Sequence, residues 1–248
     1  MTKVVLVTGG ARGIGAATVK LLAKSGYDVA VNYQSNITAV GKVVAEVKAM
    51  GRRALAVQGD VAKEADVLRM FAAVDEHLGP LWGLVNNAGI TGRIGRLDDA
   101  AAATIQSTMD VNVVGALLCA REAVKRMSTR HKGSGGVIVN LSSVATTLGN
   151  PDTYVWYAAS KGAIDAMTLG LGLEVAREGI RVVGVAPGMT DTDLHAAGGQ
   201  PDRARKIAPQ IPIGRVAQPA DIAEAIVWLM SDAARYCTAT TLRVGGGR

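Results

Sequence analysis

Short apolar runs alternate with longer segments of helical periodicity along the whole chain. Continuous runs of Val, Leu and Ala suit strands that are buried on both faces. This alternation predicts a parallel sheet with helices on both faces, joined by right-handed crossovers. The expected strands are Val4–Val7, Val29–Asn32, Ala54–Gln58, Leu81–Val85, Val137–Leu141, Val182–Val185 and Thr241–Val244. The expected helices are Gly13–Lys24, Thr38–Met50, Glu64–Leu78, Asp99–Met127, Tyr157–Glu178 and Ala220–Met230.

The chain has 248 residues, of which 49% are hydrophobic, and no internal repeat or linker interrupts it. This is enough for one core, so we expect a single Rossmann-like α/β domain over 1–248. The least regular stretch is 187–219, which follows the sixth strand. Ligands of open α/β sheets bind beyond the carboxyl ends of the strands. We therefore expect a substrate lid at about 190–219.

The net charge is +6, but the basic residues are scattered and form no cluster. This distribution favours a mildly basic enzyme for anionic ligands over a nucleic-acid-binding protein. The apolar run at the N-terminus is too short for a signal peptide, and no run is long enough for a membrane span. We expect a cytoplasmic protein. The two cysteines and three histidines have no metal-binding spacing, so no metal is expected.

A glycine-rich turn, "TGGARGIG", joins the first strand to the first helix. Gly9, Gly13 and Gly15 allow a pyrophosphate to approach the backbone, and Ile14 lies between the last two. The N-terminus of the helix supplies free N–H groups and a partial positive charge. A glycine turn by itself also occurs where a strand and a helix pack tightly. Its position directly after the first strand favours a nucleotide site.

The end of the second strand indicates which nucleotide would bind. NAD-binding proteins usually carry an acidic residue there, which binds the ribose 2′-OH. Here "VNYQSN" contains no acid and offers Tyr33, Ser35 and Asn36 instead. Arg12, in the glycine turn, opposes the helix dipole, which is more favourable if an anion lies nearby. These residues favour NADP(H) over NAD(H), with Arg12 on the 2′-phosphate.

Two further motifs follow predicted strands and so lie at the same edge of the sheet. "GDV" follows the third strand, where Asp60 can accept a hydrogen bond from the adenine amino group and Val61 follows it. "NNAG" follows the fourth strand and contains Asn86, Ala88 and Gly89. The small residues of this motif would let a ribose lie along the backbone. We expect all five residues to contact the cofactor.

Tyr157 and Lys161 are four residues apart in a predicted helix and therefore share one face. A tyrosine has a pKa near 10, and a neighbouring ammonium would favour the phenolate. Ser142 and Ser143 follow the fifth strand and could hold a substrate carbonyl. Asn112 lies within the long fourth helix and could hold a water that links Lys161 to solvent. Each feature alone is common in proteins without a catalytic site, but their order along the chain favours an active site.

These motifs resemble those of the short-chain dehydrogenases/reductases over essentially the whole chain. "TGGARGIG", "NNAG" and "YAASK" match the glycine turn, the fourth-strand motif and the catalytic Tyr-x-x-x-Lys of that family. The resemblance implies that Tyr157 is the general acid/base and that Lys161 lowers its pKa and binds the nicotinamide ribose. Ser143 would polarise the substrate carbonyl, and Asn112 would complete a proton relay. "APG" and "MTDT" resemble the nicotinamide-contacting segment, with Pro187, Gly188, Thr190 and Thr192.

The resemblance also implies the strand order 3-2-1-4-5-6-7 and a homotetramer. The nearest subgroup resembles 3-oxoacyl-carrier-protein reductases and glucose 1-dehydrogenases. The chain departs from the family pattern at Val183, at Thr238–Ala239 and at Arg243, and it has one extra residue between Ser143 and Tyr157. These departures lie outside the catalytic set. They affect the expected subunit contacts and the shape of the loop over the substrate.

The predicted activity is hydride transfer between NADP(H) and a carbonyl or secondary alcohol, with a 3-oxoacyl-type or other small carbonyl substrate. The alternatives are a sugar dehydrogenase and a non-catalytic nucleotide sensor. Tyr154 and Trp156, which flank the catalytic tyrosine, suit either the substrate pocket or a subunit interface. Met189, Leu194 and His195 begin the expected lid, and His195 reads as a surface histidine. The sequence does not identify the substrate.

Overall fold

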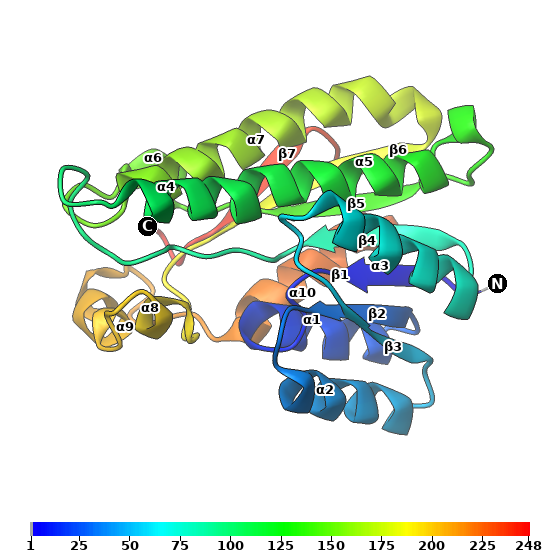
Figure 1. Ribbon diagram of the computed structural model, residues 1–248, viewed down its shortest axis with the longest axis horizontal. Coiled ribbons are helices and arrows are strands. Elements are labelled where there is room, and N and C mark those ends of the chain that lie inside the picture. Colours follow the sequence, from blue (N-terminus) through cyan, green and yellow to red (C-terminus); the bar gives the residue numbers. More distant parts are fainter. Residues whose placement is uncertain (1) are drawn as a thin grey trace.

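The computed structural model describes residues 2–248 and contains one parallel sheet of seven strands (Figure 1). The strand order is β3-β2-β1-β4-β5-β6-β7, which confirms the predicted Rossmann-like fold. The strands are β1 (Val4–Val7), β2 (Asp28–Tyr33), β3 (Ala54–Gln58), β4 (Leu81–Asn86), β5 (Gly136–Leu141), β6 (Ile180–Pro187) and β7 (Thr240–Val244). All seven predicted strands are present, and their bounds differ by at most two residues at either end.

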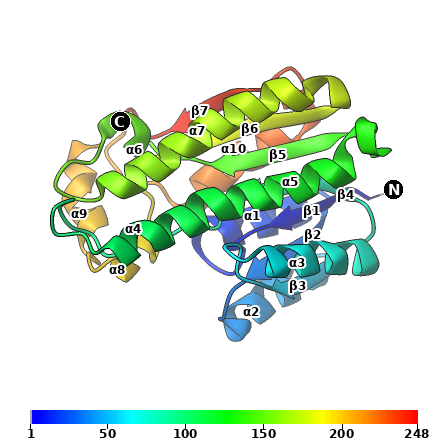
Figure 2. The same ribbon diagram turned by 45° about the horizontal axis from the view of Figure 1, so that its top comes forward.

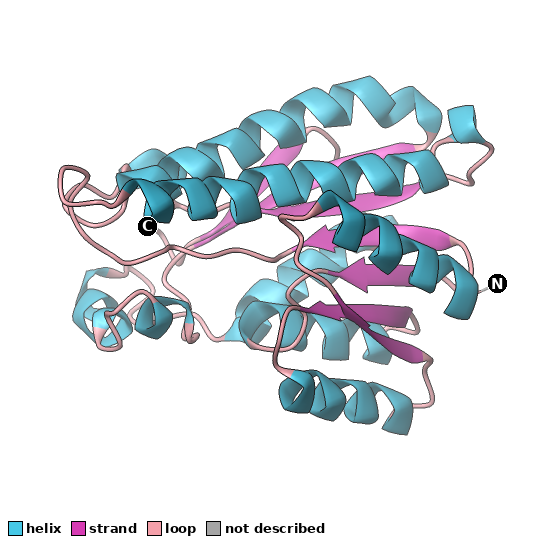
Figure 3. Ribbon diagram, in the orientation of Figure 1, coloured by secondary structure: helices cyan, strands magenta, loops and turns pink. Residues whose placement is uncertain are grey.

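Helices cover both faces of the sheet (Figure 3). One face carries α1 (Gly13–Lys24), α2 (Ile37–Ala49) and α10 (Pro219–Met230). The other face carries α3 (Glu64–His77), α5 (Gly115–Met127) and α7 (Val155–Val175), and α4 (Ala102–Met109) precedes α5. Successive residues of a strand point to opposite faces, so Val5 and Val7 pack under α1 while Val4 and Leu6 pack under α3. The two cores explain why the strands read as continuous apolar runs.

The long helix predicted over Asp99–Met127 is interrupted. A five-residue π-helical turn, Asp110–Val114, separates α4 from α5 and contains the buried Asn112. The Asn112 amide binds the backbone of the neighbouring segment, because Oδ1 accepts from the Ile90 N–H at 2.8 Å and Nδ2 donates to the Ile90 carbonyl at 2.9 Å. Such π-turns occur frequently at functional sites. Here the turn ties the helix to the loop that follows β4.

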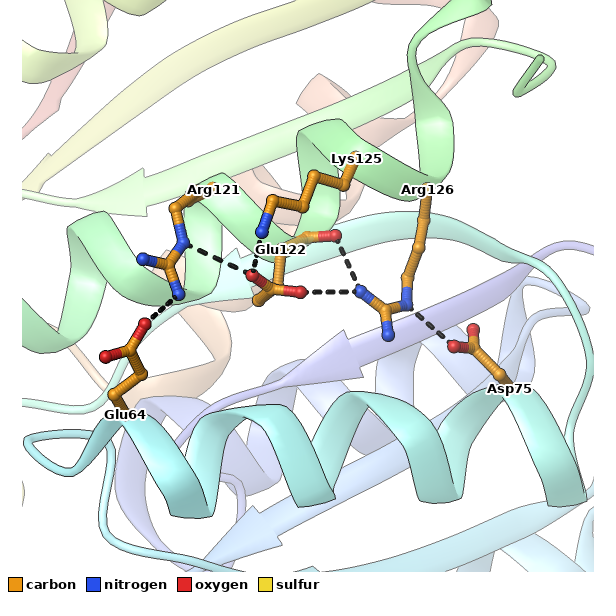
Figure 4. Close-up of polar contacts among 6 residues, drawn as sticks. All are labelled: Glu64, Asp75, Arg121, Glu122, Lys125 and Arg126. Carbon is orange, nitrogen blue, oxygen red and sulfur yellow. Dashed lines mark hydrogen bonds and ion pairs between the residues drawn. The ribbon is translucent and has the colours of Figure 1, made fainter. Parts of the chain in front are cut away.

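An ion-pair network joins α5 to α3 (Figure 4). Its centre is Glu122, which is 3% exposed and accepts hydrogen bonds from Arg121, Lys125 and Arg126 at 2.8–3.2 Å. Two of these cations reach across to α3, where Arg121 binds Glu64 and Arg126 binds Asp75. Burial alone would raise the pKa of Glu122, but the hydrogen bonds from Lys125 and Arg126 outweigh it and the pKa is lowered. The carboxylate therefore stays charged and holds α5 in place.

The segment expected to form a lid extends from the carboxyl end of β6 and contains α8 (Leu194–Ala197) and α9 (Arg203–Ile207) (Figures 1 and 2). Its base is closed by a bridge between Thr190 and Ala217. Its outer part touches the loop after β4, where the Ile94 N–H donates to the Gly198 carbonyl at 3.0 Å. A short helix, α6 (Ala145–Leu148), lies between β5 and α7. The short helices α6, α8 and α9 are not predicted by the sequence pattern.

Candidate active site

A cleft of about 880 Å³ crosses the carboxyl end of the sheet. It is lined by the turns after β1 to β6 and by the first part of the lid. Most of the sequence-predicted site residues line it, although they come from seven separate segments. They are Gly9, Arg12, Gly13, Ile14, Tyr33, Ser35, Asn36, Asp60, Val61, Ala88, Gly89, Ser143, Tyr157, Lys161, Pro187, Gly188, Thr190 and Thr192.

The glycine turn needs its glycines for two reasons. Gly9 and Gly13 have φ values of +61° and +52°, in the left-handed region that side chains disfavour. Gly15 does not line the cleft but lies under the turn, where an added Cβ would overlap the Gly9 carbonyl oxygen and lie 2.6 Å from Asn87 Nδ2. The turn can therefore wrap closely over the start of α1, leaving backbone N–H groups toward the cleft.

Two asparagines that the sequence analysis did not assign hold this turn in place. Asn87 Nδ2 donates to the Thr8 carbonyl at 2.8 Å and to the Gly9 carbonyl at 3.1 Å. Asn32 is buried at the end of β2, where its Oδ1 accepts from the Gly9 N–H at 3.1 Å and its Nδ2 donates to the Gly59 carbonyl at 3.0 Å. Both residues fix the turn against neighbouring strands.

Asn86 lies differently from what the sequence predicts. Its side chain points into the protein, where Nδ2 donates to Asn140 Oδ1 at 3.0 Å and to the Ala116 carbonyl at 3.1 Å, and it does not line the cleft. Its neighbour Asn87 lines the cleft instead. Adjacent residues of an extended chain point in opposite directions, so the two asparagines cannot share one role. Asn87, rather than Asn86, is therefore the asparagine of this motif that lines the cleft.

The far end of the cleft matches a negatively charged ligand. Arg12 precedes α1, is exposed, and makes no ion pair with any described residue. Tyr33, Ser35 and Asn36 line the same end, and Asn36 also caps α2 by accepting from the Ala39 N–H at 2.9 Å. The residues that follow β2 on this wall are uncharged.

Tyr157 and Lys161 lie one turn apart on α7 and are both buried. The Lys161 ammonium lies 5.8 Å from the centroid of the Tyr157 ring and donates to the Leu141 carbonyl at 2.6 Å. Gly89 faces the same region, because an added Cβ there would lie 3.5 Å from Lys161 Nζ and 3.3 Å from Asn112 Oδ1. The predicted shared face of Tyr157 and Lys161 is therefore present at the centre of the cleft.

The pKa values of the pair are governed by burial. Burial raises the pKa of Tyr157 strongly, Tyr154 adds to the rise, and a hydrogen bond with Ser143 acts in the opposite direction. Burial lowers the pKa of Lys161 to about 8, against a smaller raising effect of Asp165. The sequence predicts that Lys161 lowers the pKa of the phenol. In this structure the loss of hydration outweighs any such effect.

Ser143 and Asn112 complete the predicted catalytic set in different ways. Ser143 lines the cleft together with Tyr157, and its Oγ accepts from the Ala145 N–H at 3.1 Å. Ser142 instead donates at 3.5 Å to the Lys161 carbonyl. Asn112 does not line the cleft, and its Nδ2 donates at 3.0 Å to Ser160, on the catalytic helix. Asn112 therefore connects the loop after β4 to α7.

The remaining candidate residues differ in whether they line the cleft. Tyr154 lines the cleft, whereas Trp156 is buried and donates from its indole N–H to the Thr91 carbonyl at 2.8 Å. Met189 and Leu194 line the cleft as expected. His195 also lines it and is half-buried, so the expectation of a surface histidine is wrong. Burial lowers the pKa of His195 to about 4, helped by the charge of Arg203. It is neutral at physiological pH.

No metal site or membrane segment is found in residues 2–248. These residues contain no group of three or more His, Cys, Asp or Glu side chains that could hold a metal ion. Within the same range, none of the helices has the length and apolar character needed to cross a membrane.

Fold and site together define an α/β protein with a dinucleotide-type glycine turn and a Ser-Tyr-Lys set in one cleft. The family described as enoyl-(acyl carrier protein) reductase matches residues 9–248. The chain belongs to the short-chain dehydrogenase/reductase family, as its motifs predict, and it is an oxidoreductase of that family.

Three relatives illustrate the match. The uncharacterized oxidoreductase YgfF of Escherichia coli K12 is 50% identical over 245 residues, which cover 99% of each chain. The 3-oxoacyl-[acyl-carrier-protein] reductase FabG of Staphylococcus aureus is 38% identical, covering all of this chain and 98% of its own. A crystal structure of a short-chain dehydrogenase from Burkholderia cenocepacia in complex with NADP is 38% identical, with a TM-score of 0.89, covering 99% of this chain and 97% of that one.

Proposed function

We propose that this protein is an NADPH-dependent reductase of a small carbonyl compound, with a 3-oxoacyl-type compound as the reference substrate. The observation that carries this proposal is that Ser143, Tyr157 and Lys161 line one cleft, which starts at the glycine turn, with Lys161 one turn beyond Tyr157 along α7. A sensor would have no need for this buried set. The relatives include a 3-oxoacyl-carrier-protein reductase and an NADP-bound dehydrogenase, which supports the same reading.

The cleft suits NADP(H) in shape and charge. The pyrophosphate would lie against the turn formed by Gly9, Gly13 and Gly15, where a side chain at Gly15 would disrupt the cradle. The unpaired guanidinium of Arg12 and the uncharged residues after β2 suit a 2′-phosphate and would leave a free ribose hydroxyl without an acidic partner. Pro187, Gly188, Thr190 and Thr192 would border the nicotinamide carboxamide. When bound, the cofactor supplies the hydride.

The chain's own residues would handle the proton and the charge. Tyr157 holds its proton firmly because burial raises its pKa, so it enters the reduction as a proton donor. Ser143 would donate a hydrogen bond to the substrate oxygen as negative charge develops on it. Lys161 would bind the nicotinamide ribose and restore the proton to Tyr157, since its own pKa of about 8 is close to the working pH. Asn112 would fix α7 against the loop after β4.

A homotetramer fits the distribution of exposed apolar side chains. α5 and α7 lie side by side on the outer surface of the protein (Figures 1 and 2). They expose Leu117, Leu169 and Leu173. A second apolar area includes Trp228 on α10 and Leu242 on the edge strand β7. Two such faces are what a protein needs in order to form two kinds of symmetric contact, as in a D2 tetramer.

The experiment is a panel of carbonyls and alcohols assayed with both cofactors. Oxidation of NADPH with 3-oxo esters or thioesters is the expected result. If the protein reduces NADP⁺ with glucose and does not oxidise NADPH with any 3-oxo compound, it is a sugar dehydrogenase and not a carbonyl reductase. Binding of NADPH without turnover of any compound would favour the sensor.

A further inference from the structure

The lid end of the cleft contains polar groups that the proposed function does not use. Tyr154, His195, Arg203 and Arg248 all line it, together with the apolar side chains of Leu148, Met189, Leu194 and Ile207. The four polar residues come from three distant parts of the chain, namely the start of α7, the lid and the last residue of the sequence. Their convergence therefore depends on the tertiary structure.

Arg203 is held in position by its neighbours but has no acidic partner among the residues that the structure describes. Its guanidinium carbon lies 5.1 Å from the centroid of the Tyr154 ring, and Nη1 donates to Gln200 Oε1 at 3.1 Å. Its Nε is buried without a hydrogen-bond partner, and no acidic side chain in residues 2–248 forms an ion pair with it. A half-buried guanidinium without an anionic partner, and with one N–H group unbound, is costly to keep unless a ligand supplies the anion.

A second arginine, Arg248, lines the same cleft. Burial raises the pKa of the Tyr154 phenol, and the charge and a hydrogen bond of Arg203 and the charge of Arg248 act in the opposite direction. His195 adds an imidazole Nδ1 that is also buried and unpartnered. Of the acidic residues that line the cleft, only Asp193 belongs to the lid, and it makes no ion pair with either arginine among the described residues. Arg203 and Arg248 are therefore the cationic side chains that line the lid end of the cleft.

Tyr154 links this positive end to the catalytic centre. Its ring centroid lies 5.0 Å from that of Tyr157, in an edge-to-face arrangement, and 5.1 Å from the guanidinium carbon of Arg203. Because Tyr154 contacts both groups, these two distances keep the Arg203 guanidinium within the length of a small molecule from the Tyr157 ring. The apolar side chains that line the cleft near them suit a short aliphatic segment.

We propose that the natural substrate is a short oxo acid, whose carboxylate is bound at the lid end by Arg203 and Arg248 while its carbonyl faces Ser143 and Tyr157. This proposal rests on the reductase function and names its substrate class. The planar guanidinium of arginine binds a carboxylate through two parallel hydrogen bonds, which makes a carboxylate the ligand that fits. Tyr154 holds Arg203 in position through its ring, and Arg203 determines substrate specificity.

The test compares oxo acids with their methyl esters in NADPH oxidation. Acetoacetate and 4-oxopentanoate are each paired with the corresponding ester, so that only the charge changes. We expect kcat/KM to favour the acid by about tenfold or more. In Arg203→Met this preference falls to near one, because the KM of the acid rises far more than the KM of the ester. Arg205→Met is the matched control, because Arg205 lies on the same helix, is exposed and pairs with Asp202.

A binding measurement separates this proposal from the proposed function. Calorimetric titration of the NADP⁺ complex with pentanoate and with pentanamide measures binding to the anion site. Neither compound has a ketone that could be reduced, and the two differ in the charge of their end group. Tighter binding of pentanoate, lost in Arg203→Met and kept in Arg205→Met, is the expected result. If no carbonyl is reduced, the reductase function fails, and calorimetry still decides the anion site.

Three outcomes would overturn the oxo-acid proposal. The first is equal use of acid and ester by the unmodified enzyme. The second is an equal loss of kcat/KM for acid and ester in Arg203→Met, because Arg203 would then only hold the lid against Tyr154. The third is a clear preference for dihydroxyacetone phosphate over every oxo acid, which would assign the positive end to a phosphate.

Discussion

The Lys161 ammonium donates a hydrogen bond to the Leu141 carbonyl at 2.6 Å while lying 5.8 Å from the centroid of the Tyr157 ring. The lysine is thus held by the end of β5, the strand that leads into Ser143. This contact fixes one catalytic helix and one catalytic strand relative to each other. It also places a buried cation at the centre of the cleft, and this has a measurable consequence.

Lys161 should make the stability of the protein depend on pH. The pKa of Lys161 is about 8 in the folded protein, whereas that of a lysine outside the protein interior is 10.5. Between these two pH values the unfolded chain therefore binds more protons than the folded protein. Stability therefore rises with pH across this window, and the gain is lost as the pH falls through 8. We expect the wild type to gain about 2 kcal/mol relative to Lys161→Met between pH 7 and pH 10. Urea denaturation of both proteins at the two pH values measures this, and parallel profiles would contradict it.

Removing the Tyr157 hydroxyl should stop turnover and leave cofactor binding intact. Tyr157→Phe keeps the ring and its packing on Tyr154 but removes the proton donor. General acid catalysis contributes at least about a hundredfold, so kcat should fall by that factor or more. NADPH fluorescence titration should give an unchanged dissociation constant. Tyr236→Phe, at a fully exposed tyrosine, is the control and should keep full activity; activity in Tyr157→Phe near that of the control would refute the assignment.

Arg12 should distinguish NADPH from NADH. A charged hydrogen bond to a 2′-phosphate contributes enough that Arg12→Ala should weaken NADPH binding by about tenfold or more. NADH has no such phosphate, so its dissociation constant should change little. Lys24→Ala, at the other end of α1, provides the control for a general loss of positive charge. Equal losses for both cofactors in Arg12→Ala would remove its proposed role.

Two glycine-to-alanine substitutions should act in opposite directions. In Gly15→Ala the new methyl group would overlap the Gly9 carbonyl oxygen, so we expect NADPH binding to be lost and thermal stability to fall. Gly41 lies in the exposed middle of α2 with open space around it. Gly41→Ala should raise stability by about 0.5–1 kcal/mol, because alanine loses less backbone entropy in a helix. Calorimetric melting with and without NADPH measures both effects, and a Gly15→Ala protein that binds normally would disprove the cradle.

The exposed face of α5 and α7 should be a subunit contact. Leu173 is 69% exposed there, and a charge on it would have to be buried against the partner subunit. We expect Leu173→Glu to reduce the homotetramer to smaller species in light scattering coupled to gel filtration. Ile37→Glu is the matched control, since Ile37 is 70% exposed on α2, away from that face. If both variants keep the mass of the wild type, the contact lies elsewhere.

Much of the site could be predicted because its motifs follow the strands directly. The carboxyl ends of parallel strands meet at one edge, so residues after β1, β2, β4, β5 and β6 had to converge. The spacing of Tyr157 and Lys161 fixed their common face in the same local way. The preference for NADP(H) over NAD(H), the homotetramer, the cytoplasmic location and the absence of nucleic-acid binding stay predictions.

The local sequence pattern does not predict which of two neighbouring side chains faces the cleft. Asn86 and Asn87 are adjacent and identical, and only the pairing of Asn86 with Asn140 across β4 and β5 decides which of them faces the cleft. The π-helical turn at Asn112 likewise depends on the Ile90 backbone, which lies outside the helix.

The sequence by itself determined the sheet, its helical layers and the order of the catalytic residues, because these follow from periodicity and from spacing along the chain. Only the tertiary structure decided the pKa values of Tyr157 and Lys161 and the positive lid end formed by Arg203 and Arg248. Burial and electrostatic fields depend on distances between segments far apart in the sequence, and packing sets these distances.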